Sequence, residues 1–295
     1  MIKLNQRAVD VRKTEEMSRH PCFSGCASKQ YGRVHLPVAA GCNIRCNYCD
    51  RRYSCVNESR PGITDKFMKQ DDVISYLRKL FAHEPRISVV GIAGPGDPLH
   101  QPAVTLPILR EVRQNYPHIL LCLSTNGLNL PGLVDDLVAA GVGYVTVTVN
   151  AVNPEIGERI YSRVSDGNII YIGKEAASLL LARQLKGIRE LKSKGVTVKV
   201  NTVVIPGVND RHIIEVAKKM ARLDVDLMNC IGIIPVKGTP FGHKKEPTTQ
   251  EMWHIRKLTG QFLPQMSHCT RCRADAAGML GQNNHPNLCR KREKD

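Results

Sequence analysis

Directly after an apolar run at residues 34–40, the sequence reads Gly41-Cys42-Asn43-Ile44-Arg45-Cys46-Asn47-Tyr48-Cys49. The cysteines are spaced Cys-x3-Cys-x2-Cys, so three thiolates can bind three irons of one cubane cluster and leave the fourth iron open for a substrate. A structural zinc site is the alternative, but such sites usually have four ligands with paired Cys-x2-Cys spacing. The stretch therefore predicts a catalytic [4Fe–4S] cluster at a strand end, where parallel α/β folds place their active sites.

Short apolar runs rich in β-branched residues alternate with amphipathic segments, which is typical of repeated βα units around a parallel sheet. We expect strands at residues 34–40, 87–93, 119–124, 144–149, 196–204 and 227–234. Helical periodicity predicts helices at residues 71–83, 175–194 and 210–223. Six units are fewer than the eight of a closed TIM barrel, so the predicted fold is α/β, a partial (βα)6 barrel.

The cysteines also suggest how the chain is divided. We expect an N-terminal extension with cluster ligands at residues 1–33, the barrel at residues 34–264, and a C-terminal extension with a Cys-x2-Cys pair at residues 265–295. Both extensions have little periodicity yet contain five of the eleven cysteines. We expect them to fold over the barrel mouth and to be held there by metal.

Composition limits the class of protein. The 295 residues include 42 Lys plus Arg, 27 Asp plus Glu and 11 cysteines, for a formal net charge of +15. With no signal-peptide pattern or membrane-length apolar run, we expect a cytoplasmic protein, in an anaerobic or oxygen-protected setting, whose cysteines bind metal. The basic residues are spread along the chain and aromatic residues make up 5%, which disfavours nucleic-acid binding. Anionic ligands or acidic protein partners explain the charge equally well.

Eight cysteines lie outside the triad. Cys230 and Cys289 are expected to be structural, because a buried cysteine often acts as a small apolar residue. The other six are candidate ligands of auxiliary iron–sulfur clusters: Cys22, Cys26, Cys55, Cys122, Cys269 and Cys272. A structural zinc is the alternative for the last two. His35 and His20 are candidates for a further ligand, although a single histidine is more often structural.

The triad spacing, with an aromatic residue before the third cysteine, resembles the signature of the radical S-adenosylmethionine (SAM) superfamily. The resemblance implies that SAM binds the open iron and is cleaved by one electron to a 5′-deoxyadenosyl radical. It also implies SAM contacts at later strand ends, at Gly94, Gly96, Asp97, Ser124, Thr125, Asn126, Thr148, Asn150, Asn201, Val203 and Ile234. Where the family has a Gly-Gly-Glu-like motif, Pro95 here separates the glycines and the acid is Asp97.

Longer stretches resemble the NifB family of nitrogenase cofactor biosynthesis proteins. They are His20-Pro21-Cys22, residues 42–53, residues 55–62, residues 91–98 and residues 234–241. The resemblance covers roughly residues 18–282. Many bacterial members continue into a carboxyl-terminal cluster-carrier domain, so we expect a short form like those of methanogenic archaea.

This second resemblance implies an enzyme that fuses two [4Fe–4S] clusters, called K1 and K2, into a carbide-centred [8Fe–9S–C] cluster, the precursor of the nitrogenase iron-molybdenum cofactor. One SAM would donate a methyl group to a cluster sulfide, and a second would supply the radical that removes hydrogen from it, which is lyase-type chemistry. It implies three [4Fe–4S] sites, one for SAM and two for substrate clusters. The implied partners are cluster donors and an acceptor carrier or cofactor scaffold protein.

The candidate ligands can be divided by their position in the chain. We assign Cys26, Cys55 and Cys122 to one substrate cluster, and Cys22, Cys269, Cys272 and His35 to the other. Glu58 is a candidate proton relay or transient iron ligand, or else a solvated carboxylate. Arg60 is a candidate for stabilising cluster charge, or else a surface residue.

Two other functions remain open. A radical SAM enzyme with auxiliary clusters, such as a molybdopterin-type cyclase, would share the triad but would not need ligands at both Cys55 and Cys122. A non-catalytic iron–sulfur carrier would not need the SAM motifs.

Overall fold

The computed structural model describes residues 15–55 and 67–281. Its main sheet has the strand order β10-β1-β3-β4-β5-β8-β9. The parallel strands are β1 (Gly32–His35), β3 (Ile87–Ile92), β4 (Leu120–Thr125), β5 (Val142–Thr148), β8 (Thr197–Val204) and β9 (Leu227–Gly232). They are the six strands that the sequence predicts, and they curve into the expected partial barrel.

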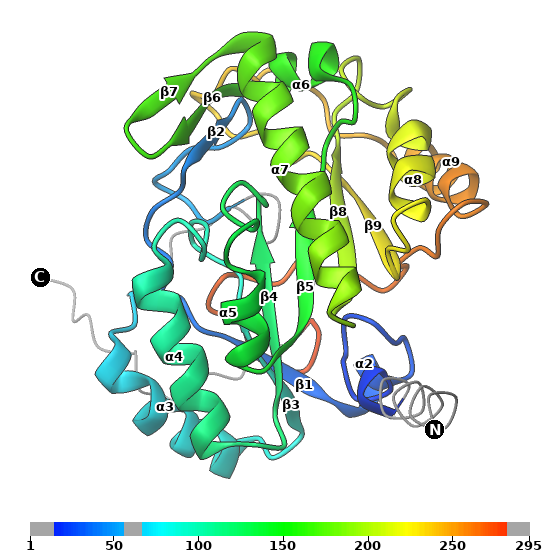
Figure 1. The fold of residues 1–295 in the computed structure, drawn as a ribbon. Helices are drawn as coiled ribbons and strands as arrows, with labels where there is room; N and C mark the ends of the chain where they lie inside the picture. Colours follow the sequence, from blue (N-terminus) through cyan, green and yellow to red (C-terminus); the bar gives the residue numbers. More distant parts are fainter. Residues whose placement is uncertain (1–14, 56–66, 282–295) are drawn as a thin grey trace, which may run out of the picture.

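Helices cover the outer face of this sheet (Figure 1). They are α3 (Gln70–His83), α4 (Pro102–Asn115), α5 (Val134–Ala139), α7 (Gly173–Ser193), α8 (Ile213–Ala221) and α9 (Thr249–Thr259), with the shorter α2 (Ala27–Gln30) and α6 (Pro154–Ile160) elsewhere. The predictions for α3, α7 and α8 are confirmed. We did not predict α4, which contains Pro107, a residue that normally interrupts a helix.

One large apolar cluster joins the helices to the sheet. Outward residues of the strands, such as Val90 and Val200, pack there with Leu77, Leu109 and Leu191 of the helices. Because side chains alternate along a strand, the residues next to each of these valines on its own strand face the barrel interior.

The first strand is shorter than we expected, because β1 ends at His35 rather than at residue 40. Pro37 lacks the backbone N–H that a strand would need. Beyond it, an isolated bridge between Ala39 and Pro95 is the contact that continues the β1–β3 alignment. The chain is thereby released from the sheet just before the cysteine triad.

A second, three-stranded sheet lies at the carboxyl end of the barrel and was not predicted (Figure 1). It consists of β2 (Ile44–Cys46), β6 (Tyr161–Asp166) and β7 (Ile169–Tyr171). In β2, Cys46 pairs with Tyr161. The triad therefore lies partly on a strand and not wholly in a loop.

The N-terminal extension lies at the opposite end of the barrel from the predicted mouth position. Phe23 packs with Leu120, Tyr144 and Leu227, which lie in the amino-terminal halves of their strands. In Figure 1, α2 is accordingly at the end of the barrel away from the β2–β6–β7 sheet. The inward apolar side chains at this end provide the surface that the extension covers.

The C-terminal segment connects the two edges of the open sheet instead of only covering its mouth. It begins at a bridge between Gln265 and Met228 of β9 and ends in β10 (Ala277–Gly278), which pairs antiparallel with β1. Edge strands have unpaired backbone groups. The segment satisfies some of these groups on both edges.

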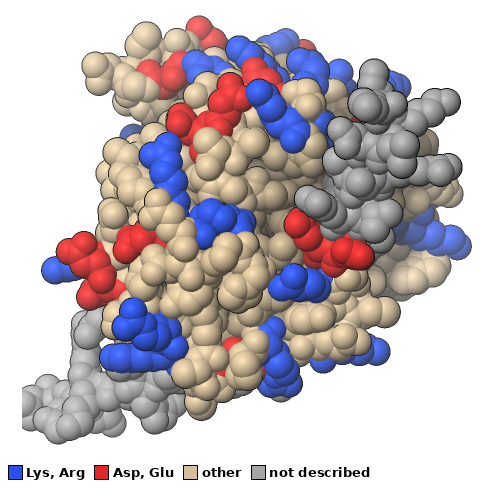
Figure 2. Space-filling view, turned by 60° about the horizontal axis from the view of Figure 1, so that its bottom comes forward, with Lys and Arg blue, Asp and Glu red and all other residues tan. Residues whose placement is uncertain are grey.

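Charged side chains of both signs are mixed on the face drawn in Figure 2. In Figure 2, Lys and Arg side chains are distributed among Asp and Glu side chains over the described part of this face. None of the helices within residues 15–55 and 67–281 combines the length and apolarity needed to cross a membrane.

Candidate active site

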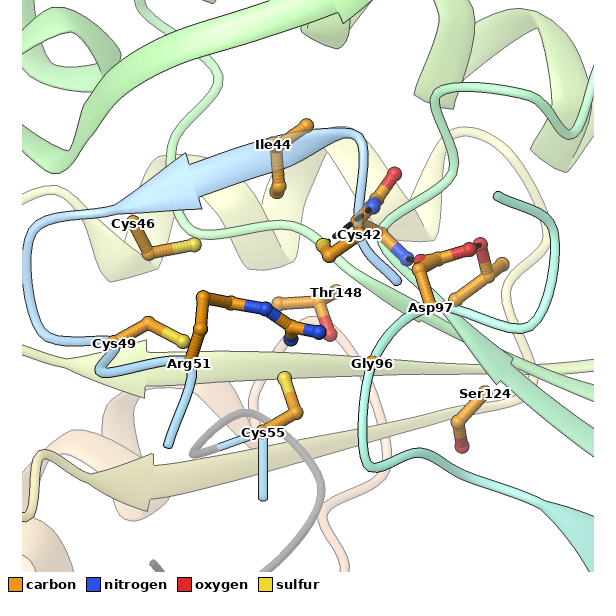
Figure 3. A pocket seen from close by; sticks show the side chains of 12 residues that line it. Cys42, Ile44, Cys46, Cys49, Arg51, Cys55, Gly96, Asp97, Ser124 and Thr148 are labelled. Atoms are coloured by element: carbon orange, nitrogen blue, oxygen red, sulfur yellow. Dashed lines mark hydrogen bonds between the residues drawn. The ribbon is translucent and has the colours of Figure 1, made fainter. Parts of the chain in front are cut away.

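The triad cysteines line one cavity at the carboxyl end of the strands. The sulfur atoms of Cys42, Cys46 and Cys49 point into the same space, and Cys55 approaches it from the other side (Figure 3). The predicted convergence of the three triad thiols is therefore present in the structure.

The donor set fits a cluster better than a single ion. Among the described residues, no three His, Cys, Asp or Glu side chains are grouped so that they could hold one metal ion. Thiolates around a cubane bind different irons and stand farther apart than the ligands of one zinc. Burial raises the pKa of the Cys42 thiol to about 12 and also raises that of Cys49. A bound metal cation would favour the thiolate form of these thiols.

Two backbone segments hold the triad in place. The N–H of Gly96 donates to the oxygen of Ala39 (2.6 Å), and the N–H of Asp97 donates to the oxygen of Gly41 (2.7 Å). A Cβ at position 96 would lie 2.7 Å from the carbonyl carbon of Gly41. Glycine is therefore required at position 96, because the segment that follows β3 contacts the residue before Cys42.

Asp97 connects the ends of β3 and β4. Its buried carboxylate accepts hydrogen bonds from the N–H of Asn126 (2.6 Å), the N–H of Leu99 (2.9 Å) and the hydroxyl of Thr125 (3.0 Å). Burial raises the pKa of Asp97, whereas these hydrogen bonds act in the opposite direction. Asp97 and Gly96 line the cavity, and their contacts with SAM, like that of Gly94, stay a prediction.

Asn126 reaches the triad directly. Its Nδ2 donates to Oδ1 of Asn43 (2.7 Å) and lies 3.7 Å from Sγ of Cys42. Gln184 of α7 donates to the backbone oxygens of Asn126 and Thr148, at 2.8 Å each. Ser124, Thr125, Asn126 and Thr148 all line the cavity. Gln184 and Asn43 were not predicted. A glutamine on the buried face of α7 was the available signal.

Arg51 is a further residue that the sequence analysis missed. Its guanidinium reaches into the cavity (Figure 3) and donates to the oxygen of Ala40 (2.6 Å). Its charge and hydrogen bond lower the pKa of the Cys49 thiol and so oppose the effect of burial. Basic residues directly after a cysteine triad were the signal.

Other predicted SAM contacts lie deeper in the protein. Asn150 donates to the hydroxyl of Tyr48 (2.7 Å) and accepts from the N–H of Val203 (2.8 Å). Asn201 accepts from Asn229 (3.2 Å), and Ile234 lies just beyond β9, partly buried. These four predicted residues are not among those that line the described cavity. Their contacts with SAM stay predictions.

A second group of thiols lies lower in the barrel, and we call Cys22, Cys122, Cys269 and Cys272 the lower thiol group. The first three pack around the same apolar cluster. The Cys22 thiol also interacts electrostatically with Cys269 and Cys272. Burial raises its pKa to about 11, while the charges of Lys199 and Arg33 act to lower it.

The structure does not bring together the predicted set of Cys26, Cys55 and Cys122. Cys26 is exposed, and Cys55 lines the triad cavity, where its N–H donates to the oxygen of Pro95 (3.0 Å). Cys122 is in the middle of β4 and belongs to the lower thiol group. Spacing along the chain could not show this, because the position of a residue along its strand, and not its place in the sequence, determines which other residues it meets in the barrel.

Of the two candidate histidines beside the lower thiol group, His20 is buried and His35 is partly buried. Nδ1 of His35 lies 3.0 Å from the oxygen of Arg273, and burial lowers its pKa to about 4. His20 packs against the rings of Phe23 and Tyr144, and burial lowers its pKa too. A neutral imidazole is the form that binds metal.

The barrel interior is polar where such barrels are usually aliphatic. Thr146, Lys199 and Asn229 alternate with outward valines and methionine on β5, β8 and β9 and are buried. Among the described residues, the hydroxyl of Thr146 and Oδ1 of Asn229 have no hydrogen-bond partner. This interior suits a polar or ionic substrate.

Three further predicted residues cannot be placed. Glu58, Arg60 and Cys289 lie outside the described residues. The ten described cysteines form no disulfide.

The curved sheet, the outer helices and the strand-end cysteine triad define a radical SAM protein. The radical SAM superfamily model matches residues 36–220, and the chain belongs to this superfamily of enzymes. Membership implies a [4Fe–4S] cluster and SAM. The fold is similar to that of methylornithine synthase (PylB), with a TM-score of 0.54 and 13% identity over 98% of this chain and 84% of that one.

Within the superfamily, the chain is similar to curated proteins named FeMo cofactor biosynthesis protein NifB. It is 45% identical to the protein of Chlorobaculum tepidum over 94% of this chain and 43% identical to that of Klebsiella pneumoniae over 91%. It spans 66% and 58% of their lengths. The resemblance to NifB that the sequence motifs predict is confirmed.

Proposed function

We propose that the chain converts two [4Fe–4S] substrate clusters into a carbide-centred [8Fe–9S–C] cluster, the precursor of the nitrogenase iron-molybdenum cofactor. In this lyase-type reaction, one SAM donates the methyl carbon and a second provides the radical that removes hydrogen from it. Similarity to NifB supports the proposal. The observation that carries it is the barrel interior, which has thiols, imidazoles and buried cations in place of aliphatic side chains.

In this proposal, Cys42, Cys46 and Cys49 hold the resident cluster, which when bound supplies the electron that cleaves SAM. The surrounding residues orient this site. Asp97 fixes the ends of β3 and β4, and Gln184 holds the ends of β4 and β5. These rigid strand ends keep SAM and its target at a fixed separation while water is excluded.

The substrate clusters would occupy two heights in the barrel. The lower thiol group with His35 is the proposed site of one substrate cluster, and Cys55 beside the triad cavity marks the site of the other. Cys26 keeps its predicted role as a cluster ligand, Glu58 as a proton relay or transient iron ligand, and Arg60 as a residue that stabilises cluster charge. An acceptor carrier or cofactor scaffold protein would take the product, in an oxygen-protected cytoplasm, and the net charge of +15 favours an acidic partner.

The proposal is tested by anaerobic reconstitution with iron, sulfide and SAM, followed by activation of cofactor-less nitrogenase. We expect iron to exceed the four atoms of one cubane and the product to restore activity. Cys42→Ala should abolish deoxyadenosine formation. Cys230→Ala is the matched control, because Cys230 is also buried but packs in the outer core, and it should keep both activities.

Two results would contradict the proposal. One is an iron content that never rises above four per chain. The other is a fully loaded protein whose product leaves cofactor-less nitrogenase inactive.

A further inference from the structure

Arg33 is a buried arginine of β1 whose guanidinium contacts the lower thiol group. The residue is 2% exposed. Its Nε and Nη2 donate to Sγ of Cys272, at 3.2 and 2.9 Å. Its Nη1 donates to the backbone oxygens of Gly278 (2.6 Å) and Met279 (3.1 Å).

The charge of Arg33 calls for an anion at this place. A guanidinium stays protonated in proteins, and burying it without an anionic partner is costly. Its hydrogen-bond acceptors within the described part of the chain are two carbonyls and the sulfur of Cys272, and none is a carboxylate. A cysteine that ligates iron carries the missing negative charge.

A second buried cation lies nearby. Lys199 of β8 is 7% exposed, and its ammonium lies 5.5 Å from the ring centre of Phe23, which follows Cys22. Arg33 and Lys199 therefore bring positive charge to the lower thiol group from two strands. Such a field favours an anionic occupant.

We propose that Arg33 is a positioning residue for an anionic iron–sulfur cluster at the lower thiol group. Its paired N–H groups orient the Cys272 thiolate, and its charge favours the reduced, more negative form of the cluster. This inference rests on the proposed function, which places a substrate cluster there. The competing explanation is that Arg33 only ties the C-terminal segment to β1.

The test uses the full chain with the three triad cysteines and Cys55, which lines the same cavity, replaced by alanine, so that no cluster signal comes from the triad cavity. After anaerobic reconstitution, iron content and the midpoint potential are measured, the potential by a titration followed by electron paramagnetic resonance. Arg33→Met should lower the midpoint potential by about 59 mV, which corresponds to a tenfold change in the one-electron reduction equilibrium. Arg33→Lys, which keeps the charge, should shift the potential less.

Arg256→Met is the matched control, because Arg256 donates to the backbone oxygen of Cys230 (2.9 Å), away from the lower thiol group. It should leave the potential unchanged. If Arg33→Met does not fold, Arg33→Lys decides: a lowered potential with an unchanged melting temperature supports the inference.

Two outcomes would overturn the inference alone. Both are an unchanged midpoint potential in the Arg33 variants: one with unchanged thermal stability, and one with lowered thermal stability, which would show that Arg33 only ties the C-terminal segment to β1. If instead the triad-less parent binds no iron at all, the proposed function fails as well, so the two failures can be distinguished.

Discussion

Replacing Gly96 with alanine should disturb the cysteine triad without touching any thiol. The new Cβ would overlap the carbonyl oxygen of Gly41, which is its nearest neighbour, and would lie 2.7 Å from the carbonyl carbon of Gly41 and 2.9 Å from Nη2 of Arg51. The arginine can move, but the Gly41 backbone cannot without moving Cys42. Because the oxygen is nearer than the carbon, the two backbones must separate by more than the 0.7 Å that would turn the 2.7 Å gap into an ordinary 3.4 Å contact.

That displacement strains two short hydrogen bonds, from Gly96 N–H to Ala39 and from Asp97 N–H to Gly41. Leaving a buried backbone group unpaired costs about 1–3 kcal/mol, so losing both costs roughly 2–6 kcal/mol. For a chain of this size each kcal/mol lowers Tm by about 2 °C. We therefore expect Gly96→Ala to lower Tm by roughly 4–12 °C.

The assay is thermal unfolding of the protein before reconstitution, followed by iron content and deoxyadenosine formation after it. The stability loss should be accompanied by weaker iron binding at the triad. Gly143→Ala is the control, because a Cβ at that strand position meets nothing within 4 Å. A Gly96→Ala variant with parental Tm and parental deoxyadenosine formation would refute the reasoning.

Three further predictions follow from single contacts. Asp97→Asn replaces an acceptor oxygen with a donor that faces the N–H of Asn126. It should lower the free energy of unfolding by about 1.5–3 kcal/mol and slow SAM cleavage, and a urea midpoint equal to that of the parent protein would contradict this. Partial burial lowers the pKa of His212 below 6.5, so the unfolded chain binds more protons than the folded one as pH falls below about 6.5, and the free energy of unfolding should decline over that range. Urea titrations at several pH values measure this decline, and His212→Gln, whose side-chain oxygen can accept the hydrogen bond from Val152 N–H, should flatten it. Cys230→Ala should lower the free energy of unfolding by about 1 kcal/mol through lost packing and leave the iron content after reconstitution unchanged. Any loss of iron would show that Cys230 is a ligand.

The strands of the barrel were predictable because each is buried on both faces. Near-continuous apolar runs, such as residues 196–204 and 227–234, are typical of buried parallel strands and therefore predict them directly. The β2–β6–β7 sheet was not predictable, because β2 has only three residues, one of which is Arg45, and its partner lies more than a hundred residues away. Local sequence contains no signal for such a pairing.

The candidate site divides in the same way. The Cys42 triad was evident from its spacing, since all three ligands are local. Arg33 and Lys199 were missed because charged residues in strands usually face solvent, and only the closed geometry shows that they face inward. The sequence also could not show that Cys122 lies away from Cys26 and Cys55, because the height of a residue in a barrel depends on the register between strands.

The path of the C-terminal segment has a consequence for the order in which the sites can form during synthesis. The residues that line the triad cavity end at Thr148, and Tyr161 and Gln184, which hold them, follow soon after, so the cavity can assemble while the chain is still being made. Cys272 comes 88 residues after Gln184, which at 5–20 residues per second is roughly 4–18 s later. A nascent chain would thus be able to take up its resident cluster before it could accept the proposed substrate cluster at the lower thiol group.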